Sequence, residues 1–134
     1  MDRKELELRK LKYVEMFQDC RWNWWGFLYV RGRHSRRHAI RQFEAWLDDL
    51  QREEGGKRFR WVRVFERGAG GEPHRFHILI GGLRSRARTW EKRWSKRRRD
   101  SSLQHLSEHP KDTIYSIVDC MDEDGKLDIS YHLW

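Results

Sequence analysis

Two strand-like runs joined by a glycine-rich turn constrain the fold of this chain more than any other feature. Residues 58–66 (RFRWVRVFE) alternate between two faces, as expected of a strand with a period of two. One face carries Phe59, Trp61 and Phe65, and the other carries Val62, Val64 and Glu66. Residues 75–80 (RFHILI) are a second strand-like run, and the intervening GAGG is typical of a turn. The two runs therefore predict an antiparallel hairpin.

The rest of the chain predicts helices and further strands. Residues 3–18 repeat apolar side chains every three to four positions, and Ser35 is suited to cap a second helix that ends near Glu53. We also expect strands at 24–30 and 127–133, a short basic helix at about 86–98, a polar loop or frayed turn at 101–112, and an apolar element at 113–121 that could be helix or strand, with helix favoured.

This order of elements predicts an α+β fold. We expect one central, mostly antiparallel sheet of about four or five strands, flanked by helices. The length of 134 residues suits a single domain, residues 1–134, with residues 1–20 as an N-terminal helical extension. The chain contains no GxGxxG or Walker pattern, which argues against ATP use.

The charge of the chain indicates a polyanionic partner. Lys and Arg outnumber Asp and Glu by 29 to 21, for a net charge of +8, and the basic residues cluster in RGRHSRR (31–37) and EKRWSKRRR (91–99). Nucleic acid is the first candidate. The residues expected to contact phosphates are Arg31, Arg33, Arg36, Arg37, Arg75, Lys92, Arg93, Lys96 and Arg97. Stacking on unpaired bases is expected from Trp22, Trp24 or Trp94, and core packing from Trp25, Trp46 and Trp61.

Cysteine usage and the first residues indicate the compartment. Cys20 and Cys120 are far apart in the chain, so we expect reduced thiols rather than a disulfide framework. The charged N-terminus is unlike a signal peptide, and no apolar run approaches the length that spans a membrane. We therefore expect a soluble, cytoplasmic protein with no membrane partner.

A carboxylate and two imidazoles near the hairpin turn form a candidate metal site. Glu66 ends one strand, and His74 and His77 begin the next, so they suit a divalent cation such as Mn²⁺ or Mg²⁺. On a regular strand, however, the two histidines face opposite sides, and Arg75 shares the face of His77. A bulge, or the end of the turn at Pro73, could rotate His74 back. Both alternatives remain open from the sequence.

Several segments together resemble a known family. ERGAGGEPHRFHILIGG resembles the metal-binding segment of the HUH endonuclease superfamily, in particular the rolling-circle replication initiators (Rep proteins) of plasmids and phages. WWGFLYVRG resembles the first Rep motif. AIRQFEAWLDDL, WVRVFE, WEKRW and the tyrosine of DTIYSIVDCM follow in the family's order, so that the resemblance spans roughly residues 22–131.

The resemblance implies a Rep-type HUH fold and a metal-dependent nuclease that nicks and joins single-stranded or hairpin DNA. Glu66, His74 and His77 would hold the metal, and Tyr115 would attack the phosphate to give a 5′-phosphotyrosine intermediate. Host replication proteins would be further partners. The family's tyrosine is commonly followed within a helical turn by Lys, whereas Ser, Ile, Val, Asp and Cys follow Tyr115. Two other functions stay open: a non-catalytic DNA-binding accessory protein on the same fold, and an unrelated basic RNA-binding domain.

Overall fold

A computed structural model describes residues 1–30, 33–83, 87–95, 101–105 and 110–133. The elements, in chain order, are α1 (Arg3–Gln18), β1 (Trp24–Val30), α2 (Arg36–Glu53), β2 (Arg60–Glu66), β3 (His74–Gly81), α3 (Ala87–Ser95), β4 (Ser101–His105), α4 (Pro110–Val118) and β5 (Ile129–His132). Side-chain caps fix the starts of the two long helices: the Asp2 carboxylate accepts from the Glu5 N–H, and the Ser35 hydroxyl accepts from the His38 N–H. None of the helices within the described ranges is long and apolar enough to span a bilayer.

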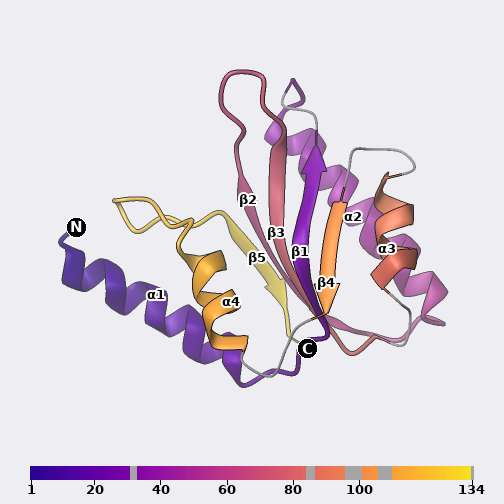
Figure 1. Cartoon of the computed structure of the whole chain (residues 1–134), viewed down its shortest axis with the longest axis horizontal. Coiled ribbons are helices and arrows are strands. Elements are labelled where there is room, and N and C mark those ends of the chain that lie inside the picture. Colours follow the sequence, from indigo (N-terminus) through magenta and orange to yellow (C-terminus); the bar gives the residue numbers. More distant parts are fainter. Residues whose placement is uncertain (31–32, 84–86, 96–100, 106–109, 134) are drawn as a thin grey trace.

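The strands form one five-stranded sheet in the order β4-β1-β3-β2-β5, and each described strand pairs antiparallel with its neighbours. The predicted hairpin is confirmed as β2 and β3, which lie side by side in the middle of the sheet (Figure 1). From β1 to β4 the chain follows the order β-α-β-β-α-β, and β5 extends the sheet beside β2. The predicted α+β class, with a mostly antiparallel sheet flanked by helices, is confirmed.

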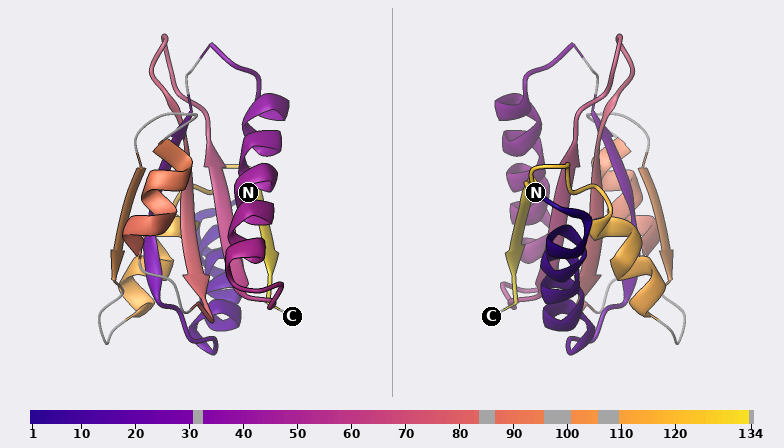
Figure 2. Two further views of the ribbon diagram at one scale, coloured as in Figure 1. Left: turned by 90° about the vertical axis from the view of Figure 1, so that its right-hand side faces the viewer. Right: turned by 90° about the vertical axis from the view of Figure 1, so that its left-hand side faces the viewer.

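Helices cover the two faces of the sheet in pairs (Figures 1 and 2). On one face, here called the core face, α2 and α3 pack on a cluster that includes Trp46, Phe76 and Trp94. On the other face, here called the site face, α1 and α4 pack on a cluster that includes Phe17 and Val64. The alternation predicted for residues 58–66 is confirmed, because the side chains of β2 divide between these two clusters.

Two predictions about the C-terminal third need correction. The segment predicted as a loop at 101–112 contains β4, which pairs with β1 from Leu28↔Ser101 to Trp24↔His105. The favoured helix at 113–121 exists, but it begins at Pro110, where proline suits the first helical turn because it lacks an N–H. Of the short helix predicted at 86–98, residues 87–95 are helical and the other positions lie outside the described residues.

Candidate functional site

The two histidines of β3 lie on opposite faces of the sheet. The pairing of β3 runs without interruption from Trp24↔Ile80 to Val30↔His74 on one side and from Arg60↔Gly81 to Glu66↔Arg75 on the other. No bulge therefore rotates His74, and the regular strand is the alternative that the structure adopts. His77 faces the site face together with Glu66 and Arg75.

His74 is held on the core face by the backbone of two loops. Its side chain packs against Phe65, with 5.4 Å between ring centroids, and the residue is only 2% exposed. The N–H of Gly68 donates to Nδ1 over 2.9 Å, so Nε2 carries the proton of the neutral ring and donates to the carbonyl of His34 over 2.7 Å. The predicted ligand set of Glu66, His74 and His77 therefore does not come together.

A different trio converges on the site face. Glu66 Oε2 lies 3.2 Å from His77 Nε2, and the Sγ atom of Cys120 lies 3.4 Å from each of these atoms. We call Glu66, His77 and Cys120 the ligand cluster, since their potential ligand atoms all lie within 4.8 Å of one another. A thiol is a poor ligand for Mg²⁺ or Mn²⁺, which prefer oxygen, so the cluster does not fit the cation predicted from the sequence.

Arg75 orients the carboxylate of this cluster. Its Nε and Nη2 atoms lie 2.8 and 2.6 Å from Glu66 Oε1, which leaves Oε2 to face His77 and Cys120. Burial acts to raise the pKa of Glu66, but the hydrogen bonds from Arg75, Cys120 and His77 outweigh it and hold that pKa below its usual value. Glu66 is therefore ionised at neutral pH.

The environment keeps the other two members of the ligand cluster uncharged. Burial lowers the pKa of His77 against the opposing influence of Glu66, and the residue is 7% exposed. Burial, together with the hydrogen bond to Glu66, raises the pKa of the Cys120 thiol to about 12. The metal-free site thus contains a carboxylate, a neutral imidazole and a thiol.

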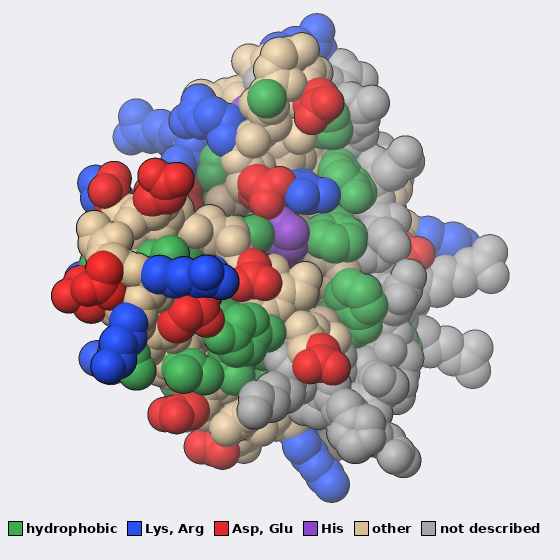
Figure 3. Space-filling model, turned by 60° about the vertical axis from the view of Figure 1, so that its left-hand side comes forward, with side chains coloured by type: hydrophobic (Ala, Val, Ile, Leu, Met, Phe, Trp, Pro, Cys, Tyr) green, Lys and Arg blue, Asp and Glu red, His purple; other side chains and the backbone are tan. Residues whose placement is uncertain are grey.

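A half-exposed row of aromatic side chains lies beside the ligand cluster. Trp25, Phe27 and Tyr29, here called the aromatic row, alternate along β1 on the site face and are each only half-buried. Neighbouring ring centroids in the row are 6.3 and 6.2 Å apart. The ring of His77 lies 5.0 Å from that of Phe27, and the Arg75 guanidinium lies 5.5 Å from the same ring. Figure 3 shows hydrophobic side chains running down this face beside a histidine and an acidic–basic pair.

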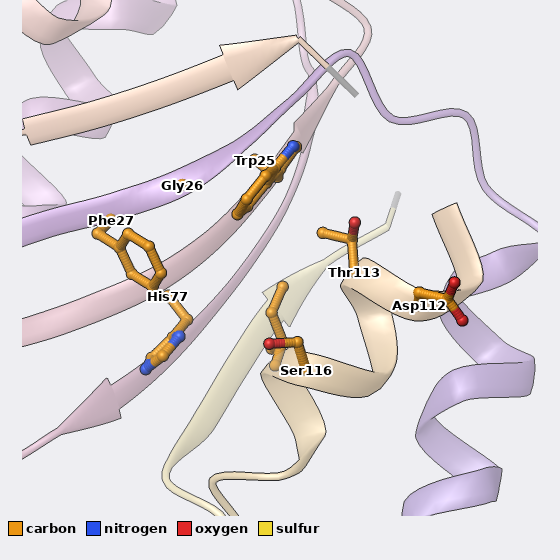
Figure 4. Close-up of a pocket in the computed structure, with 8 residues that line it drawn as sticks. Trp25, Gly26, Phe27, His77, Asp112, Thr113 and Ser116 are labelled. Atoms are coloured by element: carbon orange, nitrogen blue, oxygen red, sulfur yellow. The ribbon is translucent and has the colours of Figure 1, made fainter. Parts of the chain in front are cut away.

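A small pocket opens between the aromatic row and α4. It has a volume of about 220 Å³ and is lined by Trp25, Gly26, Phe27, His77, Asp112, Thr113, Ser116 and Ile117. Figure 4 shows the aromatic rings on the strand facing Thr113 and Ser116 on the helix. One wall is thus aromatic and the other carries hydroxyl and carboxylate groups, a combination that suits a small, flat, polar ring.

Tyr115, the predicted nucleophile, points away from this pocket. Its hydroxyl donates to Glu7 Oε2 on α1 over 2.7 Å, whereas its helical neighbours Thr113 and Ser116 line the pocket. The hydrogen bond to Glu7 raises the pKa of Tyr115, which opposes the ionisation that a nucleophile needs. The structure therefore does not bring Tyr115 together with Glu66 and His77.

The predicted phosphate contacts fall into three groups. Arg33, Arg37 and Lys92 are exposed, and Arg31, Lys96 and Arg97 lie outside the described residues. The other three form ion pairs: Arg36 with Asp128, Arg75 with Glu66, and Arg93 with Glu53. Lys92 and Arg93 on α3, like Arg36 and Arg37 on α2, belong to the helices that cover the core face, whereas Arg33 lies in the segment between β1 and α2.

The assignment of tryptophans to stacking or packing was wrong in part. Trp22 and Trp94 are buried and donate to the carbonyls of Phe17 and Tyr29, and Trp24 packs against the core face. Trp25, expected in the core, is half-buried: it packs against the cluster of the site face and also belongs to the aromatic row. The alternation of WWGFLYV contained the signal for the row, since it places Trp25, Phe27 and Tyr29 on one face. Nothing in the spacing of Cys120 indicated that it would join Glu66 and His77.

Comparisons with protein-family models, with curated proteins and with solved structures found no match.

Proposed function

We propose that this chain binds single-stranded DNA on the site face, with unpaired bases stacked on the aromatic row. The observation that carries this proposal is the row itself: three half-exposed rings on an inner strand, with a guanidinium against the middle one. Stacking of a base on an aromatic ring is worth about 1–3 kcal/mol and tolerates any sequence. Such a platform needs bases that are free of a partner strand, which favours a single strand over a duplex.

Charge supports the same proposal. The net charge of +8 attracts a polyanion, and phosphates released from their counterions would account for a steep salt dependence. Arg33 is exposed in the segment between β1 and α2, after the Tyr29 end of the row, where it could neutralise a phosphate of a strand that follows β1. The pocket between α4 and the rings of Trp25 and Phe27 would take one unstacked base.

The choice of DNA over RNA comes from the resemblance to Rep proteins. The β-α-β-β-α-β order with its antiparallel sheet is compatible with the Rep-type, ferredoxin-like fold. The nicking and joining that the resemblance also implies is a separate proposal, and the position of Tyr115 argues against this residue as its nucleophile. A non-catalytic DNA-binding protein therefore agrees better with the geometry.

The binding proposal is tested by fluorescence anisotropy with a labelled oligothymidine at two salt concentrations. Tyr29→Ala should weaken binding by between about 5- and 150-fold, which corresponds to the loss of one stacked base. Tyr131→Ala is the matched control. Tyr131 is 42% exposed and lies on the same face of the sheet, but on the edge strand β5, away from the aromatic row. Equal losses in the two variants would contradict the proposal, and a preference for oligouridine would favour the RNA-binding alternative.

The nicking proposal has its own test. The protein is incubated with a pool of single-stranded oligonucleotides and Mn²⁺, and a denaturing gel is searched for a covalent adduct. We expect no adduct through Tyr115, because its hydroxyl is bonded to Glu7 and turned from the ligand cluster. An adduct that disappears in Tyr115→Phe would restore the enzymatic function.

A further inference from the structure

We propose that Glu66, His77 and Cys120 form a zinc-binding site. The three residues come from the end of β2, the middle of β3 and the turn that follows α4, so the fold rather than local spacing assembles them. The proposal does not depend on nucleic-acid binding. It names a softer ion and a different ligand set from those that the sequence suggested.

The spacing of the three ligand atoms fits a tetrahedral zinc ion. Zinc binds nitrogen and oxygen at about 2.0–2.1 Å and sulfur at about 2.3 Å, so neighbouring ligand atoms around a tetrahedral ion lie roughly 3.3–3.6 Å apart. The corresponding distances here are 3.2 Å between Glu66 Oε2 and His77 Nε2, and 3.4 Å from Cys120 Sγ to each of these atoms. The three atoms thus already outline one face of a zinc tetrahedron.

The types of the three ligand atoms also select zinc. A thiolate, an imidazole and a carboxylate are the three protein ligands that zinc uses, and a thiolate discriminates against Mg²⁺ and Mn²⁺. Zinc would replace the proton of the Cys120 thiol, and that proton would pass to solvent. Three protein ligands leave the fourth position to water, as in zinc sites that carry out chemistry.

Neighbouring side chains orient two of the three ligands. Metal-ligating groups are usually oriented by hydrogen bonds from a surrounding shell of residues. Arg75 bonds only to Oε1 of Glu66, through two nitrogen atoms, and so presents Oε2 to the cluster. The ring of Phe27 packs against that of His77 and limits its rotation. The adjoining pocket, which His77 helps to line, gives an ion a route from solvent.

The test uses the whole chain, freed of metal with a chelator. The cysteines are kept reduced with a reagent that contains no thiol, because a thiol would compete with the protein for zinc. Zinc is titrated by calorimetry, and cobalt is titrated separately, because a thiolate ligand gives Co²⁺ a charge-transfer absorption in the near ultraviolet. We expect one zinc per chain, a cobalt spectrum with that absorption, and no saturation by Mn²⁺ at the same concentrations. The cobalt spectrum detects the thiolate ligand in the unmodified protein, so this measurement does not depend on whether a variant folds.

Variants then assign the ligands. Cys120→Ser and His77→Gln should each weaken zinc binding by more than about 100-fold, the upper end of what the loss of a merely supporting residue costs. Cys20→Ser is the matched control, since Cys20 is the chain's other free cysteine and lies just beyond α1, outside the cluster. Circular dichroism verifies that each variant is folded. Absence of saturable zinc binding, equal affinity for Mn²⁺, or unchanged binding in both ligand variants would overturn the proposal.

Discussion

The two faces of the sheet are both covered by a pair of helices, but different side chains occupy them. On the core face, aromatic rings from α2, β3 and α3 pack edge to face, as in the contacts of Trp46 with Trp90 and Trp94. The indole N–H groups of Trp46 and Trp94 donate to backbone carbonyls, so these large side chains are buried with their polar atoms satisfied.

The site face combines a smaller apolar cluster with ionisable groups. Val62, Val64 and Leu79 pack under α1 and α4, whereas Glu66, Arg75 and His77 lie next to them toward the open part of the sheet. The same strands thus contribute apolar side chains to the core on one face and ionisable side chains to the other face. The alternation of side chains along a β-strand thus allows neighbouring residues to serve the core and a binding face separately.

The contrast between the two faces is tested most strongly by removing one tryptophan from each of them. Trp46→Ala should cost about 3–5 kcal/mol of unfolding free energy, because Trp46 is fully buried and fills the centre of the core face. Trp25→Ala removes a half-buried ring of the aromatic row and should cost about 1 kcal/mol. Urea unfolding followed by circular dichroism measures both values. Equal losses would mean that the row is part of the core.

The two histidines of β3 differ between the faces in the same way. In His74→Ala the Gly68 N–H loses its acceptor, so we expect a loss of about 1–3 kcal/mol in unfolding free energy and unchanged zinc affinity. His77→Ala should have the reverse profile: a smaller loss of stability in the metal-free protein, since Glu66 keeps Arg75 as a partner, and loss of zinc binding. Urea unfolding and zinc calorimetry on the same samples measure both. A loss of zinc affinity in the His74 variant would return this residue to the ligand set.

The smallest expected effect concerns the contact between α1 and α4. Glu7 raises the pKa of Tyr115 by accepting its hydrogen bond, and the same bond lowers the pKa of Glu7. The raised tyrosine pKa means that the bond's stabilisation is present below pH 10 and is lost as pH rises through the folded value. The lowered glutamate pKa means that it is present above pH 4.5 and is lost on acidification.

Glu7→Gln should therefore bring the pKa of Tyr115 down toward 10, as followed by carbon NMR of the labelled tyrosine ring. Glu5→Gln serves as the control, since Glu5 is exposed on the same helix and its carboxylate is not among the groups that act on the pKa of Tyr115. An unchanged Tyr115 titration in Glu7→Gln would show that the contact with α1 is absent in solution. The tyrosine would then be free to turn toward the ligand cluster.

Much of the fold could be predicted because the periodic spacing of apolar residues matches the way each element is buried. Residues 58–66 alternate and 36–53 carry an apolar stripe, and both segments form the expected element. β4 was missed because SSLQH has neither alternation nor β-branched side chains. Its conformation comes from backbone pairing with β1 at the edge of the sheet, a tertiary contact that local pattern does not encode.

The site was less predictable because its members meet only in three dimensions. Alternation placed Glu66, Arg75 and His77 on one face, since these residues belong to the hairpin. Cys120 comes from a turn 54 residues beyond Glu66, and only the packing of α4 on the sheet brings it there. The direction of Tyr115 likewise depends on α1, whose Glu7 is 108 residues away.

The layer over the site face is closed by the two ends of the chain. Lys10 pairs with Asp119, and Arg9 donates to the carbonyl of Gly125, contacts that join residues 109 and 116 positions apart. Contacts of such high sequence separation carry a large loop-closure entropy, so α1 and α4 should dock after the strands have paired and detach before they separate. Hydrogen exchange would register this as earlier deuteration of α1 and α4 than of β3. Undocking of α4 would also carry Cys120 away from Glu66 and His77, so the ligand cluster would come apart while the aromatic core stays intact.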